Sequence, residues 1–100
     1  MIDLYTAATP NGWKASVALE EMGLEYTAHA VNLMKGEQKT PEFLAMNPNG
    51  KIPVLDLGDG ISLGESNAII NYLAWDSPLY PSERLAQARI QQWQFFEQYS

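Results

Sequence analysis

The sequence contains no cysteine and only one histidine, His29. The absence of cysteine excludes disulfide bonds, thiolate metal ligands and any redox chemistry carried by a protein thiol. A single histidine cannot build a metal cluster by itself, so we expect no metal site. A chain without cysteine fits a reducing compartment, and we expect a cytoplasmic protein.

Basic residues are also scarce, since six Lys and Arg stand against twelve Asp and Glu and give a net charge of −6. Recognition of a nucleic-acid backbone needs a basic surface, so we expect no nucleic-acid partner. No apolar run approaches the roughly 20 residues of a membrane span. The first residues, "MIDLY", lack the basic region of a signal peptide. We therefore expect no membrane association.

What the sequence does contain is enough apolar residues, 46% of 100, for a packed core. The hydrophobic pattern predicts a strand at 2–5, a helix at 10–22, a strand at 26–33, a charged loop at 34–39, a short helix at 41–46, two strands within 52–63 and a helix at 64–74. The first half is typical of a βαβ unit with parallel strands, and the second half of a ββα unit. Together they predict a small mixed sheet with helices on its faces.

Turn and cap residues fix the ends of these elements. Thr9 and Thr40 each precede a proline, which predicts a threonine N-cap with proline at the first helical position. Gly58-Asp59-Gly60 predicts a hairpin between the last two strands. The helix at 64–74 should bury a face made of Ala68, Ile69, Tyr72 and Leu73.

A proline-containing linker at 77–82 precedes a last helix at 83–100, with Ser82 as its N-cap and Glu83 in its first turn. The apolar residues of this helix cover an arc too wide for one surface stripe: they are Leu85, Ala86, Ile90, Trp93, Phe95, Phe96 and Tyr99. We therefore interpret residues 1–76 as one domain and 83–100 as the start of a truncated helical domain. The alternative is that this helix packs back on the sheet or dimerises.

In this order, the segments resemble the N-terminal thioredoxin-like domain of glutathione transferases. The resemblance rests on a hydroxyl residue after the first strand, "NPNGKIPVL" at 47–55 and "LGESNAIINYLA" at 63–74. "TPNG", "LEEMGLEY" and "KGEQ" followed by "PEF" are most similar to the bacterial nu class and the yeast-prion-related branch. The resemblance to the glutathione transferases implies an α/β thioredoxin-like βαβ-ββα domain with a mixed four-stranded sheet, followed by the first helix of an all-α C-terminal domain.

The resemblance also implies a glutathione site. Glu65 and Ser66 would bind the γ-glutamyl group, because a helix start presents a hydroxyl and unpaired N–H groups to a carboxylate. Ile52–Pro53 would form a cis peptide whose Ile52 backbone pairs with the cysteinyl backbone. Lys51 and Gln38 would hold the glycyl carboxylate, with Lys35 and Lys39 nearby. Each of these assignments has an ordinary structural alternative. Ser66 and Glu65 would then only cap a helix, Pro53 would only start an edge strand, and Gln38 and the lysines would be solvated loop residues.

Thr9 and Asn11 would act on the glutathione sulfur, because hydrogen-bond donors and a helix N-terminus lower the pKa of a thiol. Gly12 would leave room for a close approach. Tyr5 lies within the first strand, upstream of the usual loop, which favours Thr9 with Asn11. His29 and the aromatic residues Tyr72, Trp93, Phe95 and Phe96 are interpreted as structural. Trp13 would line either an acceptor pocket or a domain interface.

Two functions follow from the resemblance. The first is a glutathione transferase that activates the glutathione thiol for conjugation to an electrophile or for disulfide reduction, as a homodimer in the full-length protein. The second is a non-catalytic interaction module of the same fold, a class that typically loses the ligand-binding residues retained here. A thioredoxin or glutaredoxin proper is excluded, because it needs a cysteine.

Overall fold

The computed structural model describes residues 2–75, 77 and 79–99, apart from the side chain of Tyr99. The order of its elements is β1 (Asp3–Thr6), α1 (Pro10–Glu21), β2 (Thr27–Ala30), the 3₁₀ helix η1 (Glu37–Lys39), α2 (Pro41–Met46), β3 (Val54–Gly58), β4 (Ile61–Gly64), α3 (Ser66–Ala74) and α4 (Arg84–Tyr99). The predicted α/β class is confirmed. The expected domain boundary at 76, Pro78 of the linker and the expected helix end at 100 lie outside the described residues.

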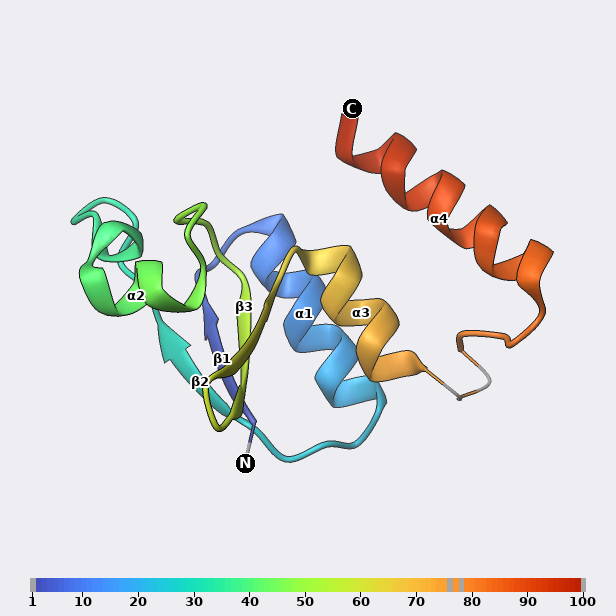
Figure 1. Cartoon of the computed structure of the whole chain (residues 1–100), viewed down its shortest axis with the longest axis horizontal. Helices are drawn as coiled ribbons and strands as arrows, with labels where there is room; N and C mark the ends of the chain where they lie inside the picture. Colours follow the sequence, from blue (N-terminus) through green and yellow to red (C-terminus); the bar gives the residue numbers. More distant parts are fainter. Residues whose placement is uncertain (1, 76, 78, 100) are drawn as a thin grey trace.

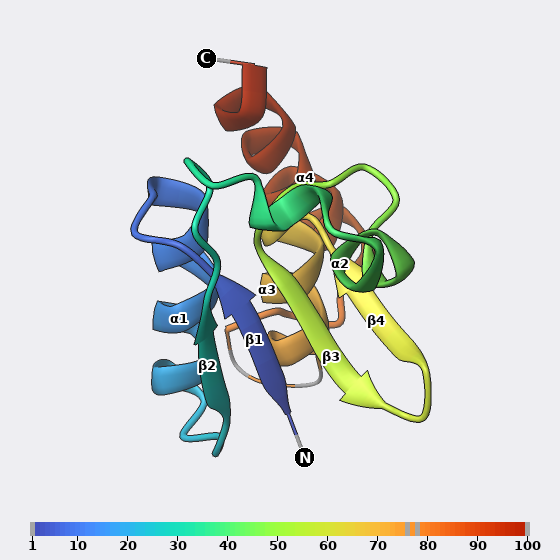
Figure 2. The same ribbon diagram turned by 90° about the vertical axis from the view of Figure 1, so that its left-hand side faces the viewer.

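The sheet has four strands in the order β2-β1-β3-β4. β1 and β2 are parallel, whereas β3 is antiparallel to both β1 and β4. Helix α1 connects the parallel pair, and the turn Gly58-Asp59-Gly60, with all three residues at positive φ, closes the β3–β4 hairpin. The mixed sheet expected from a βαβ half and a ββα half is therefore the observed one (Figures 1 and 2).

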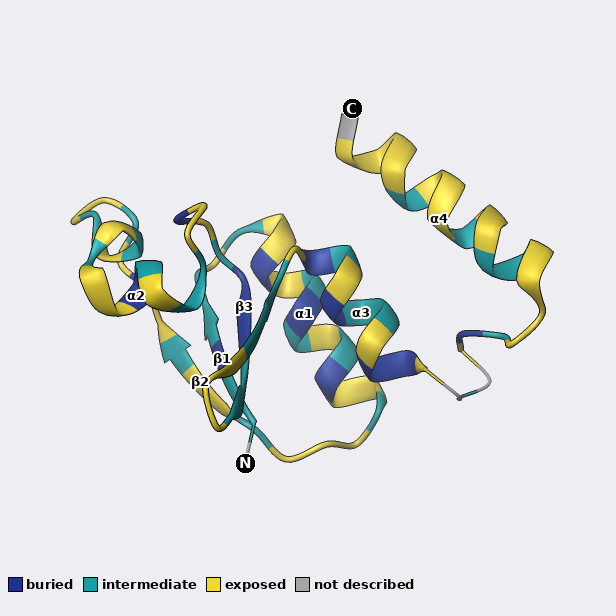
Figure 3. Ribbon diagram, in the orientation of Figure 1, coloured by how far each residue is buried: buried dark blue, intermediate teal, exposed yellow. Residues whose placement is uncertain are grey.

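The core lies on both sides of the sheet, because neighbouring residues of β3 point to opposite faces. Helices α1 and α3 cover one face and α2 the other (Figure 2). The larger cluster, under α1 and α3, consists of Leu4, Ala15, Leu19, Leu55, Ile69 and Leu73. The smaller one, under α2, consists of Val31, Phe43 and Val54. Figure 3 shows the buried positions gathered on the sheet and on the sides of α1 and α3 that face each other.

The two threonine caps form as predicted. Thr9 Oγ1 accepts a hydrogen bond from the backbone N–H of Gly12 at 3.2 Å, and Thr40 Oγ1 accepts one from Phe43 at 3.3 Å. The cap predicted for the last helix was wrong. The Glu83 carboxylate, rather than Ser82, accepts from the N–H groups of Leu85 and Ala86 at 3.1 and 2.6 Å. A carboxylate has the reach and the charge to satisfy two such donors at once.

The predicted buried face of α3 was half wrong. Ile69 and Leu73 are buried, but Ala68 is exposed and the Tyr72 side chain keeps 51% of its accessible surface. The face on the core is formed by Ser66, Ile69, Leu73 and Ala74. Ala68 and Tyr72 are four residues apart, so they form a stripe of their own on another side of the helix. Hydrophobicity alone did not distinguish the two stripes.

Several element boundaries differ from the prediction by one residue, and three differences are larger. β2 ends at Ala30 rather than 33, because its partner β1 offers only residues 3–6 and Val31 N–H closes the ladder on Thr6 O at 2.7 Å. Residues 37–39 of the expected loop form η1. α3 starts at Ser66 rather than Gly64, which pairs with Val54 as the end of β4.

Helix α4 stands beside α3 and carries much of its apolar surface outward (Figures 1 and 3). Its side chains Leu85, Trp93, Phe95 and Phe96 are between 54% and 66% exposed. The expectation that this helix needs further neighbours agrees with that exposure. Within the described ranges, no helix is long and apolar enough to cross a membrane.

Candidate functional site

The strand order brings three of the predicted segments to one end of the sheet. Tyr5 pairs with Val54, so the loop that leaves β1 toward Thr9 starts beside Pro53. Val54 also pairs with Gly64, so Glu65 and Ser66 follow on the other side of Pro53. The ends of β1 and β4 and the start of β3 therefore meet at the same edge (Figure 2). A site assembled there draws on residues from across the sequence.

Gly12, in the first turn of α1, is buried against the end of β1. A Cβ at this position would lie 2.2 Å from the carbonyl oxygen of Ala7 and 2.5 Å from Thr6 Oγ1. The close approach predicted for Gly12 is thus made by the chain's own backbone, and the idea that it leaves room for a ligand was wrong. Glycine here lets α1 start directly against the loop from β1.

Asn11 and Ser66 come together although they are 55 positions apart in the sequence. The Ser66 hydroxyl donates to Asn11 Oδ1 at 3.4 Å, and Ser66 is the buried polar residue of this edge, only 3% exposed. The contact joins the first turn of α1 to the first residue of α3. Two helix N-termini therefore face the same edge: α1 offers the N–H of Asn11, since Pro10 has none and Gly12 donates to Thr9, and α3 offers the N–H groups of its first turn.

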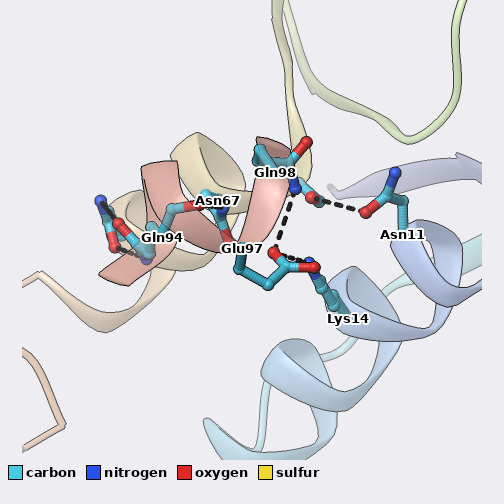
Figure 4. A network of polar contacts seen from close by, with 8 residues as sticks. Asn11, Lys14, Asn67, Gln94, Glu97 and Gln98 are labelled. Carbon is cyan, nitrogen blue, oxygen red and sulfur yellow. Dashed lines mark hydrogen bonds and ion pairs between the residues drawn. The ribbon is translucent and has the colours of Figure 1, made fainter. Parts of the chain in front are cut away.

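The hydrogen bonds within this pair determine what Thr9 and Asn11 can offer to a ligand. Thr9 Oγ1 is already an acceptor for Gly12 N–H, and Asn11 Oδ1 is already an acceptor for Ser66. A hydroxyl keeps one proton to donate and an amide keeps its NH₂ group. In Figure 4 the Asn11 nitrogen lies on the side away from the dashed contact. Both side chains are thus set up as donors, which suits an anionic sulfur.

The peptide between Ile52 and Pro53 is cis, as the resemblance implied. Pro53 is fully buried and Ile52 is half-buried. Across the sheet end from this peptide, Glu65 has a backbone φ of 70°. A left-handed residue directly before α3 turns the chain sharply at the point where the helix N–H groups begin.

Gln38 and Lys51 lie close to each other on the α2 side of this edge. A Cβ on the buried Gly50 would lie 3.2 Å from the Gln38 carbonyl and 2.7 Å from Lys39 Nζ, so η1 packs on the turn before Lys51. Asn47 fixes that turn by donating to the Lys51 carbonyl at 2.8 Å. The Gln38 side-chain oxygen is buried, with no hydrogen-bond partner among the described residues. This oxygen is an acceptor, so a bound ligand could satisfy it only with a donor such as an N–H group, and a carboxylate would bind the Gln38 NH₂ group instead.

His29 has structural contacts in β2. Its Nε2 lies 2.9 Å from Asp3 Oδ1, and its ring stacks on Tyr5 with centroids 4.5 Å apart. These contacts support the interpretation of His29 as a structural residue. They also show that the Tyr5 ring, within β1, packs on His29. In the parts of the chain that are described, no group of three or more acidic or histidine side chains is placed to hold a metal ion.

A network of polar contacts near the site was not anticipated from the sequence. Lys14, in α1, forms an ion pair with Glu97 of α4. Gln94 of α4 pairs with Asn71 and Asn67 of α3 (Figure 4). Single glutamines and asparagines on helices carry no recognisable pattern, so no signal in the sequence pointed to these pairs.

The ion pair predicts a specific pH dependence of stability. The hydrogen bond from Lys14 lowers the pKa of the Glu97 carboxyl below its ordinary value of 4.5. When the pKa of a carboxyl is lower in the folded chain than in the unfolded chain, its ionised form stabilises the fold at every pH above the unfolded-state pKa. This contribution is lost as the pH falls through the folded-state pKa. We expect Lys14→Met to lower the urea midpoint at pH 7 and to match wild type near pH 3. A difference that persists at low pH would contradict this assignment.

Comparison with known proteins identifies the fold and the family. The family model "Glutathione S-transferase, N-terminal domain" matches residues 1–75. "Disulfide-bond oxidoreductase YfcG" of Escherichia coli is 46% identical over 104 residues, which cover 97% of this chain and 48% of the relative. "Transcriptional regulator URE2" of Saccharomyces cerevisiae is 37% identical over 99 residues, covering 90% of this chain and 28% of that protein.

A solved structure carries the same fold together with ligand. It is a glutathione transferase family member from Pseudomonas fluorescens with two glutathione bound, 45% identical, with a TM-score of 0.86 over 97% of this chain and 45% of that one. The present chain thus spans about half the length of YfcG and of this structure. The match over residues 1–75, the thioredoxin-like sheet and these similarities show that the chain belongs to the glutathione S-transferase family.

Proposed function

We propose that this chain binds glutathione at the sheet edge and activates its thiol, as the N-terminal half of a glutathione transferase. The observation that carries the proposal is the contact between Asn11 and Ser66, which joins the two helix N-termini at that edge. The proposed sulfur site at α1 and the proposed carboxylate site at α3 would then lie side by side. Glutathione needs both, because its cysteinyl thiol and γ-glutamyl carboxylate are parts of one small molecule.

The γ-glutamyl group would bind at the start of α3. The N–H groups of the first turn, that of Ser66 among them, would receive the carboxylate, and Glu65 would pair with the neighbouring ammonium. The backbone of Ile52 would pair with the cysteinyl backbone as an added strand does. Lys51 and Gln38 would hold the glycyl carboxylate; because the chain is net acidic, local donors rather than long-range attraction must do this.

The thiol would lie at the start of α1, where Thr9 and Asn11 donate hydrogen bonds to it. Donors that favour the charged form lower the pKa of a thiol and raise its thiolate fraction at neutral pH. The thiolate would then add to an activated double bond of an electrophile, or displace a leaving group from it, and form a thioether; alternatively it would attack a disulfide, form a mixed disulfide with it and release one thiolate. A second glutathione thiolate would complete that reduction, giving glutathione disulfide. The chain has no cysteine to replace glutathione in either step.

The acceptor site and the assembly are part of the proposal. In this family a helical domain follows, and we propose that residues 83–100 are its first helix, so that the exposed apolar side chains of α4 are covered by the helices after it. The full-length protein would be a cytoplasmic homodimer. Trp13, on α1, is 59% exposed and could line the acceptor pocket completed by that domain.

A second candidate is a non-catalytic interaction module, favoured by the similarity to a relative named as a transcriptional regulator. Titration separates the two functions. We expect the chain to bind glutathione, and Ser66→Ala to weaken binding at least about tenfold, since it removes the buried hydrogen bond to Asn11 that joins the two helix starts of the site. Calorimetry with glutathione and glutathione disulfide measures this. Ser77→Ala, in the linker, is the matched control. Absence of binding by folded wild type would contradict the proposal.

A further inference from the structure

We propose that Gln94, on α4, is a positioning residue for the glutathione site, because it ties α4 to the start of α3, one of the two helix starts that form the site. This inference rests on the proposed function. Gln94 Nε2 donates to Asn71 Oδ1 at 2.8 Å, and Asn71 Nδ2 donates back to Gln94 Oε1 at 3.0 Å. Asn67 Nδ2 donates to the Gln94 carbonyl at 3.3 Å. One residue of α4 therefore contacts α3 at two successive turns.

The α3 end of this contact lies next to the site. Asn67 directly follows Ser66, whose hydroxyl donates to Asn11. The α1 end is equally close, because Lys14 lies one turn after Asn11 and pairs with Glu97, one turn after Gln94. Figure 4 shows Asn11, Lys14, Asn67, Gln94 and Glu97 around one junction of three helices. Helix α4 thus holds α1 and α3 at the level where Asn11 meets Ser66.

Apolar packing joins α1 to α3 through Ala15, Leu19, Ile69 and Leu73, but among the described residues this cluster includes none from α4. A cavity of about 470 Å³ lies between α1, α3 and α4, lined by apolar side chains that include Val17, Ile70 and Ile90. The large side chains Trp93 and Phe95 of α4 point to solvent, with 66% of each exposed. The polar contacts of Gln94 and Lys14 are therefore what sets the angle and depth of α4 on this side.

The Asn11–Ser66 contact is sensitive to that spacing. At 3.4 Å between the oxygen atoms it is already long for a hydrogen bond between oxygens, so a small separation of α1 from α3 breaks it. Once released, Asn11 no longer has its oxygen occupied and its NH₂ directed at the sulfur position. Loss of Gln94 should then weaken glutathione binding and raise the pKa of the bound thiol, without removing any group that touches glutathione.

The test compares Gln94→Leu with the double variant Asn71→Leu/Gln94→Leu and with the control Gln92→Leu, an exposed position of the same helix. The single variant leaves the polar side chain of Asn71 facing a leucine, whereas the double variant places two apolar side chains opposite each other and leaves no unpaired polar group. Lys14→Met removes the ion pair between α1 and α4, and it provides a second test if Gln94→Leu does not fold. Calorimetry measures glutathione affinity, and thiolate absorbance against pH measures the pKa of the bound thiol.

We expect Gln94→Leu and Lys14→Met each to weaken glutathione binding about fivefold and to raise the pKa of the bound thiol. The double variant should recover most of the affinity, and Gln92→Leu should match wild type. If wild type binds while Gln94→Leu and Lys14→Met bind equally well with an unchanged thiol pKa, the inference is overturned and the proposed function stands. If folded wild type does not bind glutathione, both fail together.

Discussion

Replacing Gly12 by alanine is expected to destabilise this domain by about 3 kcal/mol. A Cβ there would meet the Ala7 carbonyl oxygen at 2.2 Å and Thr6 Oγ1 at 2.5 Å. The first of these atoms belongs to the backbone, so the clash cannot be relieved by turning a side chain. Either α1 moves off the end of β1 or the loop between them is rebuilt. Urea unfolding followed by circular dichroism measures the loss.

Gly64→Ala is the matched control for this substitution. A Cβ at Gly64 would lie 3.3 Å from Asn47 Nδ2, so that side chain would have to shift by a few tenths of an ångström against its hydrogen bond to the Lys51 carbonyl, a much smaller change than the backbone clash at Gly12. We expect it to cost under about 1 kcal/mol. Equal midpoints for the two variants would show that the start of α1 is loose, and the close packing inferred for Gly12 would be wrong. A surviving Gly12→Ala protein should also bind glutathione poorly, because α1 carries Thr9 and Asn11.

The fold was predictable because its elements are defined by local chemistry. A threonine before a proline starts a helix at Thr9 and again at Thr40, and both caps form. The Gly58-Asp59-Gly60 turn closes the hairpin, and the crossover through α1 requires parallel strands. These signals lie within a few residues of the feature that they determine, so one sequence contains them in full.

What the sequence did not give depends on contacts between distant segments. The buried side of α3 was only half predicted, since Ala68 and Tyr72 form as good an apolar stripe as Ile69 and Leu73, and only the position of α1 distinguishes them. The part played by Gly12 was misread for the same reason, because its neighbours Thr6 and Ala7 belong to a strand end whose position relative to α1 is a tertiary fact.

In the candidate site, too, some residues could be predicted from the sequence and others could not. The resemblance pointed to Thr9, Asn11, Glu65 and Ser66, and strand order explains why they can share one edge. The ion pair of Lys14 and the amide pairs of Gln94 had no such signal. They join α1, α3 and α4 across as many as 83 positions of sequence, through residue types that are common on any helix surface.

Thr9→Asp is expected to leave the domain as stable as wild type but to lower thiol-transfer activity at neutral pH by about tenfold to a hundredfold. Thr9 has two roles that usually fail together. Its oxygen caps α1 by accepting from Gly12 N–H, and its proton is available to the glutathione sulfur. Aspartate caps a helix as well as threonine does, but an ionised carboxylate has no proton to donate and repels a thiolate.

Two further substitutions make the comparison decisive. Thr9→Ser keeps both the cap and the proton, so stability and activity should stay close to wild type. Thr9→Val removes both, so it should lose about 1 kcal/mol of stability together with activity. The measurements are urea midpoints and the pKa of bound glutathione from thiolate absorbance, which Thr9→Asp should raise. If Thr9→Asp keeps the low thiol pKa of wild type, Thr9 is only a helix cap, and the donor that activates the sulfur must be Asn11, through its side chain or its backbone N–H.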